Sequence, residues 1–171
     1  MWISPKTKKK AFEQDELYWF IGERKGHEKG INTYIMTMIS REPRQIVAYA
    51  VDNTVKATLI QKMVDGTVQA ERYYTDGGSA YTGVDFIGCH IRNMTDKSDT
   101  HNIESTNADL RHYIAGLRRR SRCFFRSLET LRAVLYVFVH AYNRFGDAKM
   151  QYMLNHPHCL RVYHLNHLAF I

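Results

Sequence analysis

With 171 residues and a mass of 20.0 kDa, the chain is long enough for one domain with a substantial hydrophobic core. Its hydrophobic content of 44% and aromatic content of 12% exclude a disordered chain. The 24 Lys and Arg exceed the 17 Asp and Glu, which gives a net charge of +7 and favours polyanionic partners such as nucleic acids.

The amino-terminal half predicts an arm, three strands and a helix. Residues 1–11 carry a lysine cluster and predict a flexible basic arm. Aromatic and branched residues then predict strands over 15–22, 31–39 and 45–51, which short loops would join into an antiparallel meander. A helix follows, with Thr54 as its N-cap and Gly66 at its end.

The second half alternates strands and helices. We expect a short buried strand at Tyr73–Thr75, a short helix at 79–84 and a strand at 89–91. Longer helices are predicted over 103–117 and 127–142, and the apolar residues of the second suggest packing on the sheet or a dimer interface. The pattern predicts an α/β fold with a mixed sheet of five strands, three antiparallel and then parallel, flanked by helices.

Three acidic residues fall where such a fold would bring them together. Asp76 follows the Tyr73–Thr75 strand at a Gly-Gly turn, Asp15 begins the first strand, and Glu104 opens a helix. Converging carboxylates repel one another unless cations neutralise them. We therefore expect Asp15, Asp76 and Glu104 to be catalytic and to bind two Mg²⁺ or Mn²⁺ ions for phosphoryl transfer, with Asp15 bridging both ions.

Other interpretations of these acids remain open. Asp76 alone could be a turn residue that hydrogen-bonds its own backbone. Glu16 adjoins Asp15, but alternation along a strand predicts that it points to the opposite face.

Basic residues cluster on and after the Glu104 helix. Their offsets place Asn107, Arg111 and Arg118 on roughly the same face of the 103–117 helix as Glu104. Guanidinium groups suit phosphates, so we expect a DNA-binding surface; a solvated arginine run is the alternative. The predicted DNA-binding residues are Asn107, Arg111, Arg118, Arg119, Arg120, Arg122 and Arg126.

The cysteines and the carboxyl-terminal residues complete the sequence. The chain has three cysteines, widely spaced and without a C-x-x-C pair, which predicts reduced thiols in the cytoplasm. No apolar signal core follows the lysine cluster, and no apolar run is long enough to span a membrane. Residues 146–171 are rich in histidine, but their spacing matches no structural zinc pattern, so we expect a tail.

Three segments together resemble the catalytic region of insertion-sequence-one transposases, and the order and spacing agree over roughly residues 12–143. They are Asp-Glu-Leu-Tyr-Trp-Phe-Ile-Gly (15–22), Tyr-Thr-Asp-Gly-Gly-Ser-Ala-Tyr (74–81) and Ile-Glu-Ser-Thr-Asn-Ala-Asp-Leu-Arg (103–111). The basic stretch at 117–129 is also similar. The resemblance implies a ribonuclease-H-like fold over residues 12–145, with a DDE triad that matches Asp15, Asp76 and Glu104.

The resemblance also implies Mg²⁺-dependent cutting and joining of transposon DNA. We expect double-stranded DNA as partner, homo-oligomers on DNA, and a nucleoid-associated location in the cytoplasm. Family members usually carry an amino-terminal DNA-reading region, so we expect this chain to be fused to, or paired with, an upstream-frame DNA-binding protein. The alternatives are a ribonuclease-H-like nuclease that only cleaves and a non-catalytic DNA-binding regulator of transposition.

Overall fold

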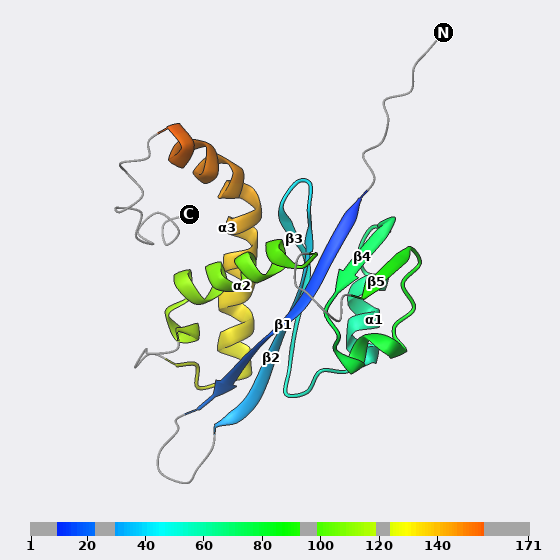
Figure 1. Ribbon diagram of the computed structural model, residues 1–171. Helices are drawn as coiled ribbons and strands as arrows, with labels where there is room; N and C mark the ends of the chain where they lie inside the picture. Colours follow the sequence, from blue (N-terminus) through cyan, green and yellow to red (C-terminus); the bar gives the residue numbers. More distant parts are fainter. Residues whose placement is uncertain (1–9, 23–29, 93–98, 119–123, 156–171) are drawn as a thin grey trace.

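The computed structural model describes residues 10–22, 30–92, 99–118 and 124–155, with side chains up to residue 146. Within these ranges a mixed sheet lies between helices on its two faces (Figure 1). Nearly all of the predicted basic arm, and the predicted tail from residue 156 onward, lie outside the described residues.

The first three strands form the predicted antiparallel meander. β1 pairs along its whole length with β2, and β2 pairs with β3. The first strand begins earlier than predicted, so that Asp15 lies within it and not at its head. The strands are β1 (Ala11–Ile21), β2 (Ile31–Ser40) and β3 (Gln45–Asp52).

Two short parallel strands complete the sheet, as predicted. β4 (Arg72–Thr75) pairs with β1, and β5 (Cys89–Arg92) pairs with β4. The sheet order is β3-β2-β1-β4-β5, which makes β1 the central strand. β4 ends at Thr75, opposite Gln14, and no other described strand pairs with β1 beyond this point on that side.

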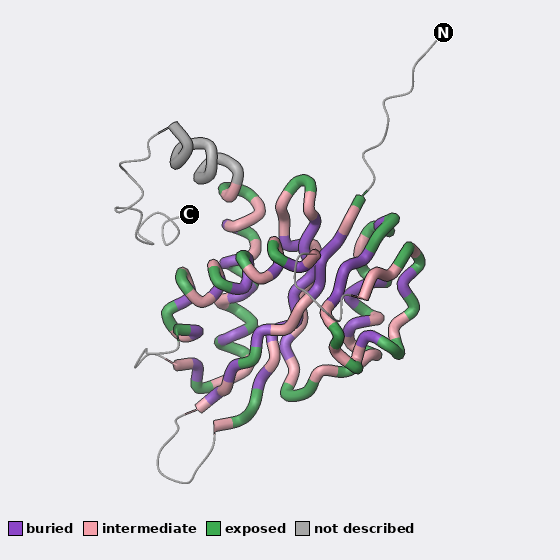
Figure 2. Tube along the Cα trace, in the orientation of Figure 1, coloured by how far each residue is buried: buried purple, intermediate pink, exposed green. Residues whose placement is uncertain are grey.

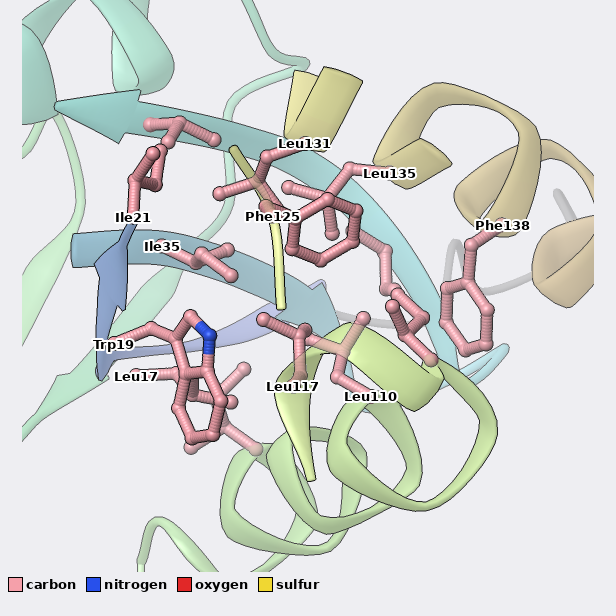
Figure 3. Close-up of a cluster of buried hydrophobic side chains, with 14 of the residues drawn as sticks. Leu17, Trp19, Ile21, Ile35, Leu110, Leu117, Phe125, Leu131, Leu135 and Phe138 are labelled. Atoms are coloured by element: carbon pink, nitrogen blue, oxygen red, sulfur yellow. The ribbon is translucent and has the colours of Figure 1, made fainter. Parts of the chain in front are cut away.

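The helices divide the core into two parts (Figures 1 and 2). α2 (His101–Tyr113) and α3 (Leu128–Asn155) cover one face of the sheet, and α1 (Ala57–Asp65) covers the other. Figure 3 shows the larger core, where the fully buried Leu110, Leu131 and Leu135 pack on strand residues. The apolar stripe of α3 therefore packs on the sheet, while Tyr136 and Val137 on the same helix are exposed.

Three helix boundaries differ from the predictions by three residues or more. α1 begins at Ala57, after an extended Lys56, and not at Thr54. α2 ends at Tyr113 and is followed by an extended Ile114 and a 3₁₀ turn, η2 (Ala115–Leu117), so Arg118 is not on the α2 face. α3 continues to Asn155, well past residue 142.

The short helix predicted at 79–84 is a 3₁₀ helix, η1 (Ser79–Gly83), which directly follows the Asp76 turn. Among the described helices, none combines the length and the apolar character needed to cross a membrane.

Candidate metal centre

Asp76 lies where the sequence predicted it, directly after β4, and its carboxylate shapes the turn that follows. Its Oδ1 atom accepts a hydrogen bond of 2.8 Å from the backbone N–H of Gly78. A Cβ atom at position 78 would lie 3.0 Å from that oxygen, so glycine permits this close approach. The turn-forming role and a role in a site are therefore compatible, because the same carboxylate also belongs to a cluster of acids.

That cluster consists of Asp15, Glu16 and Asp76. One carboxylate oxygen from each residue lies within 4.8 Å of the others, and all three side chains are half-buried. Hard carboxylate oxygens at this spacing suit a divalent cation such as Mg²⁺ or Mn²⁺. The donor set therefore fits the metal that the sequence predicted, although one of its members differs.

Glu16 is the member that the sequence argument set aside. Alternation holds, because Asp15 contacts α2 whereas Glu16 lies near Tyr81, which belongs to the core on the α1 face. It does not keep the two carboxylates apart, however. β4 ends opposite Gln14, so side chains from both faces of β1 reach the open edge where Asp76 leaves the sheet.

The environment of Glu16 disfavours its charged form. Burial raises the pKa of Glu16 to about 7, the negative charges of Asp15 and Asp76 act in the same direction, and the Tyr81 hydroxyl opposes them. Burial and the carboxylate of Glu16, and to a smaller extent the charges of Asp15 and Asp76, also raise the pKa of Tyr81. The cluster thus brings like charges together in a half-buried place, which a bound cation would stabilise.

Glu104 lies in the first turn of α2 and is half-buried. Among the described residues, it is not part of the group whose carboxylates lie within 4.8 Å of one another. The next turn of α2 does reach the cluster, since Asn107 donates a hydrogen bond of 3.0 Å to Asp15 Oδ2. The structure therefore brings together two of the three predicted acids and places the helix of the third against them.

Glu13 is a site-shaping residue that the sequence argument missed. Its side chain is fully buried and accepts three hydrogen bonds: from Arg41 Nε at 2.7 Å, from Asn102 Nδ2 at 2.7 Å and from the backbone N–H of Ile103 at 2.9 Å. Thr100, at the start of α2, makes no side-chain capping bond. Glu13, which lies on β1, caps the amino end of the helix instead. It thereby fixes the amino end of α2 beside Asp15.

The predicted DNA-binding residues fall into three groups. Asn107 is only 5% exposed and its side chain bonds Thr37 and Asp15, so its DNA contact stays a prediction. Arg118 and Arg126 are exposed and Arg111 is half-buried. The other predicted contacts, at Arg119, Arg120 and Arg122, lie outside the described residues.

No protein-family model and no curated protein matches the sequence. Among solved structures, the chain is similar to the Mos1 transposase paired-end complex with the left transposon end, with a TM-score of 0.51 and 14% identity over 77% of this chain and 48% of that chain. The Mos1 strand transfer complex gives a TM-score of 0.48 and 14% identity over 77% of this chain and 47% of that one. The chain spans about half the length of these neighbours. The first likeness, together with the five-stranded mixed sheet, shows that this chain has the ribonuclease-H-like fold found in the Mos1 transposase.

Proposed function

We propose that the chain is the catalytic domain of a DDE-type transposase, which cleaves DNA at insertion-sequence ends and joins the freed 3′ ends to target DNA. The observation that carries the proposal is the convergence of Asp15, Glu16 and Asp76 beside the carboxyl end of β4 in a ribonuclease-H-like fold. In open α/β sheets this edge is where ligands bind. Because a DNA phosphodiester is itself anionic, three carboxylates there are useful only with a cation between them and the substrate.

The residues that would hold the metal come from three elements. Asp15 on the central strand and Asp76 after β4 are the proposed ligands, with Glu104 from α2 as the third, as the resemblance implies. Glu16 competes for this third role, because its carboxylate already lies within reach of the other two. Divalent ions held here would activate the attacking oxygen and stabilise the leaving oxygen of the phosphodiester.

The chain's own residues would then bind the ions and orient the DNA. The half-buried carboxylates fix the charge at the edge of the sheet, and no protein side chain is proposed as a covalent nucleophile. Arg118 and Arg126 are exposed residues that would contact DNA phosphates, although the Arg118 guanidinium also donates two hydrogen bonds to the backbone carbonyl of His112. Double-stranded DNA, a second copy of the chain and an upstream-frame DNA-binding protein are the proposed partners.

The direct test uses Mn²⁺ or Mg²⁺, the full chain and labelled transposon-end DNA. We expect metal-dependent strand cleavage that falls by several orders of magnitude in Asp76→Asn. Asp65→Asn is the matched control, since Asp65 is an exposed residue at the end of α1. Cleavage that persists in Asp76→Asn would reject the proposed centre.

The same assay decides the third ligand. We compare Glu104→Gln with Glu16→Gln, two substitutions that remove a charge with little change in volume. Loss of cleavage in Glu104→Gln alone would support the DDE triad. Loss in Glu16→Gln alone would assign the third position to Glu16.

A ribonuclease-H-like nuclease is the second candidate, because the same fold and acids would serve cleavage without joining. Pre-cut transposon ends are incubated with a supercoiled plasmid and Mg²⁺. Joined products support the transposase, whereas cleavage without any joined product supports the nuclease.

DNA binding is tested separately from catalysis. Arg119→Ala with Arg120→Ala is expected to weaken DNA binding and to reduce the salt dependence of log K by about one unit of slope for each phosphate that is no longer neutralised. An unchanged slope would remove these arginines from the proposed DNA surface.

A further inference from the structure

A chain of two hydrogen bonds, the first buried and the second half-buried, leads from β2 through α2 to Asp15. Thr37 lies directly opposite Asp15 in the register of β1 and β2. The Thr37 hydroxyl donates to Asn107 Oδ1 at 3.0 Å, and Asn107 Nδ2 donates to Asp15 Oδ2 at 3.0 Å. Thr37 and Asn107 are only 1% and 5% exposed, so water has little access to the bond between them, whereas the Asp15 end is half-buried.

The direction of the bonds matters for Asp15. A carboxylate only accepts hydrogen bonds, so the amide of Asn107 is useful to it in one orientation, with the NH₂ group facing Asp15. The hydroxyl of Thr37 donates to the other end of the amide and thereby favours this orientation. The reversed amide would place its carbonyl oxygen against the Asp15 carboxylate, where the two would repel each other.

The chemical nature of Asn107 is also informative. An arginine or lysine at this position would neutralise Asp15 and compete with a cation for its charge. A neutral amide restrains one carboxylate oxygen and leaves the charge of the cluster unchanged. Groups that orient metal-binding side chains in this way commonly contribute to metal affinity without touching the metal.

We infer that Asn107 is a positioning residue for the candidate metal centre, and that Thr37 sets the orientation of its amide. This inference rests on the proposed metal site. It assigns Asn107 a role inside the protein in place of the DNA contact predicted from the sequence. It also explains why α2 contacts β1 at Asp15: the contact holds the carboxylate in a fixed position before any ion binds.

The test measures binding of Mn²⁺ alone to the full chain by titration calorimetry, so that it does not depend on catalysis. Asn107→Leu removes both bonds at similar volume and is expected to weaken Mn²⁺ binding about 10–100-fold. Thr37→Val removes only the hydroxyl and is expected to weaken it by a smaller factor in the same direction. Thr37→Ser keeps the donor and should bind Mn²⁺ like the wild type.

Thr33→Val is the matched control. Thr33 is another fully buried threonine of β2, and its hydroxyl donates to the backbone carbonyl of Ile31 at 3.1 Å, away from the cluster. We expect this variant to bind Mn²⁺ like the wild type, even if its melting temperature falls as much as that of Thr37→Val. The melting temperatures of all variants are measured without metal, which separates weakened folding from weakened binding.

The possible results are distinct. Weaker Mn²⁺ binding in Thr37→Val that Thr37→Ser restores supports the inference. Wild-type binding in both Thr37→Val and Asn107→Leu, or an equal loss in Thr33→Val, overturns it and leaves the metal site intact. Failure of the wild-type chain to bind Mn²⁺ overturns the metal site itself, and the inference with it.

Discussion

Glu13 and Glu16 lie three positions apart on the central strand, yet the protein surrounds them in opposite ways. Glu13 is fully buried on the α2 face and accepts hydrogen bonds from Arg41, Asn102 and the backbone of Ile103. Glu16 is half-buried near Tyr81, and its nearest charged neighbours are other carboxylates. One acid is surrounded by hydrogen-bond donors, whereas the other has two carboxylates beside it and the Tyr81 hydroxyl to oppose them.

This difference separates a structural acid from a candidate functional one. A buried carboxylate with a cationic partner and further hydrogen bonds has its desolvation offset, so it can anchor a helix. Like charges beside a carboxylate add to its desolvation cost, and the raised pKa of Glu16 expresses the net cost. Burial of a carboxylate therefore does not by itself mark a candidate functional site. The charges of the neighbouring groups distinguish the two cases.

The largest expected effect is the loss of the structural acid. Glu13→Gln removes the shorter of the two ion pairs that Arg41 makes among the described residues and leaves only the one with Asp99 at 3.8 Å. It also turns an NH₂ group toward donors that then have too few acceptors. Removing one partner of a buried ion pair typically costs about 3–5 kcal/mol, and we expect the lower end because Arg41 is 26% exposed. Urea unfolding at neutral pH measures the change.

Glu71→Gln provides the comparison for that measurement. Glu71 is exposed, at the start of the β4 region, so the same substitution should change the free energy of unfolding by less than about 0.5 kcal/mol. Equal losses in the two variants would show that the donors around Glu13 do not stabilise the fold.

Glu16 should affect stability in a pH-dependent way. Its pKa is raised from 4.5 to about 7 by burial and by neighbouring charges. An acid whose pKa is higher in the folded state contributes fully below pH 4.5, and the contribution is lost as pH rises through 7. Without metal, the wild type should lose stability relative to Glu16→Gln over this range, by at most about 3 kcal/mol.

Unfolding curves with a chelator at pH 5 and pH 8 test this expectation. The difference between wild type and Glu16→Gln should shift in favour of the variant at the higher pH. A difference that is the same at both pH values would mean that Glu16 does not titrate in this interval.

Adding metal should reverse the effect of pH on the stability of the wild type. Ionised carboxylates bind Mg²⁺ or Mn²⁺ and protonated ones do not, so the ion should stabilise the wild type more at pH 8 than at pH 5. Ligand linkage predicts a gain of about 2.7 kcal/mol at a concentration one hundred times the dissociation constant. Melting curves of the wild type and of Asp76→Asn measure the effect, and an equal gain in the variant would place the ion elsewhere.

The contrast between the two glutamates also shows what the sequence can predict. The strands, their antiparallel-then-parallel order and the place of Asp76 follow from local patterns: apolar runs, turn residues and a Gly-Gly pair after a short strand. Asp15 lies within β1 and not at its head, because residues 11–14 extend the strand. Glu13 is a charged residue, so the sequence did not predict a buried strand here. Its carboxylate is hydrogen-bonded by Arg41 and Asn102, which lie 28 and 89 positions away in the sequence.

The cluster itself combines local and tertiary information. Alternation correctly places Asp15 and Glu16 on opposite faces, but only the length of β4 determines that both reach the same open edge. Gly116 was a local sign that α2 ends early, but the apolar periodicity of the segment still predicted a helix to residue 117. A Cβ atom on Gly116 would lie 2.5 Å from the Phe125 ring, so this glycine serves the close approach of a later segment.

The smallest expected effect concerns Gly78, where stability and site geometry can be separated. Its φ of −53° is open to any residue, so Gly78→Ala adds no backbone strain and even lowers the entropy of the unfolded chain, by about 0.4–1 kcal/mol. The added Cβ would lie 3.0 Å from Asp76 Oδ1 and 3.3 Å from the Tyr81 ring, a crowding that opposes this gain. We expect a net change in unfolding free energy below about 1 kcal/mol.

The displaced atom is the Asp76 carboxylate, so the effect of Gly78→Ala should appear in metal binding. We expect weaker Mn²⁺ affinity at nearly unchanged stability. Gly146→Ala is the control: nothing lies within 4 Å of its added Cβ, and this helical position should gain about 0.5–1 kcal/mol without any change in Mn²⁺ binding. If Gly78→Ala binds Mn²⁺ like the wild type, Asp76 tolerates displacement. The turn at β4 would then not be what holds this acid beside Asp15 and Glu16.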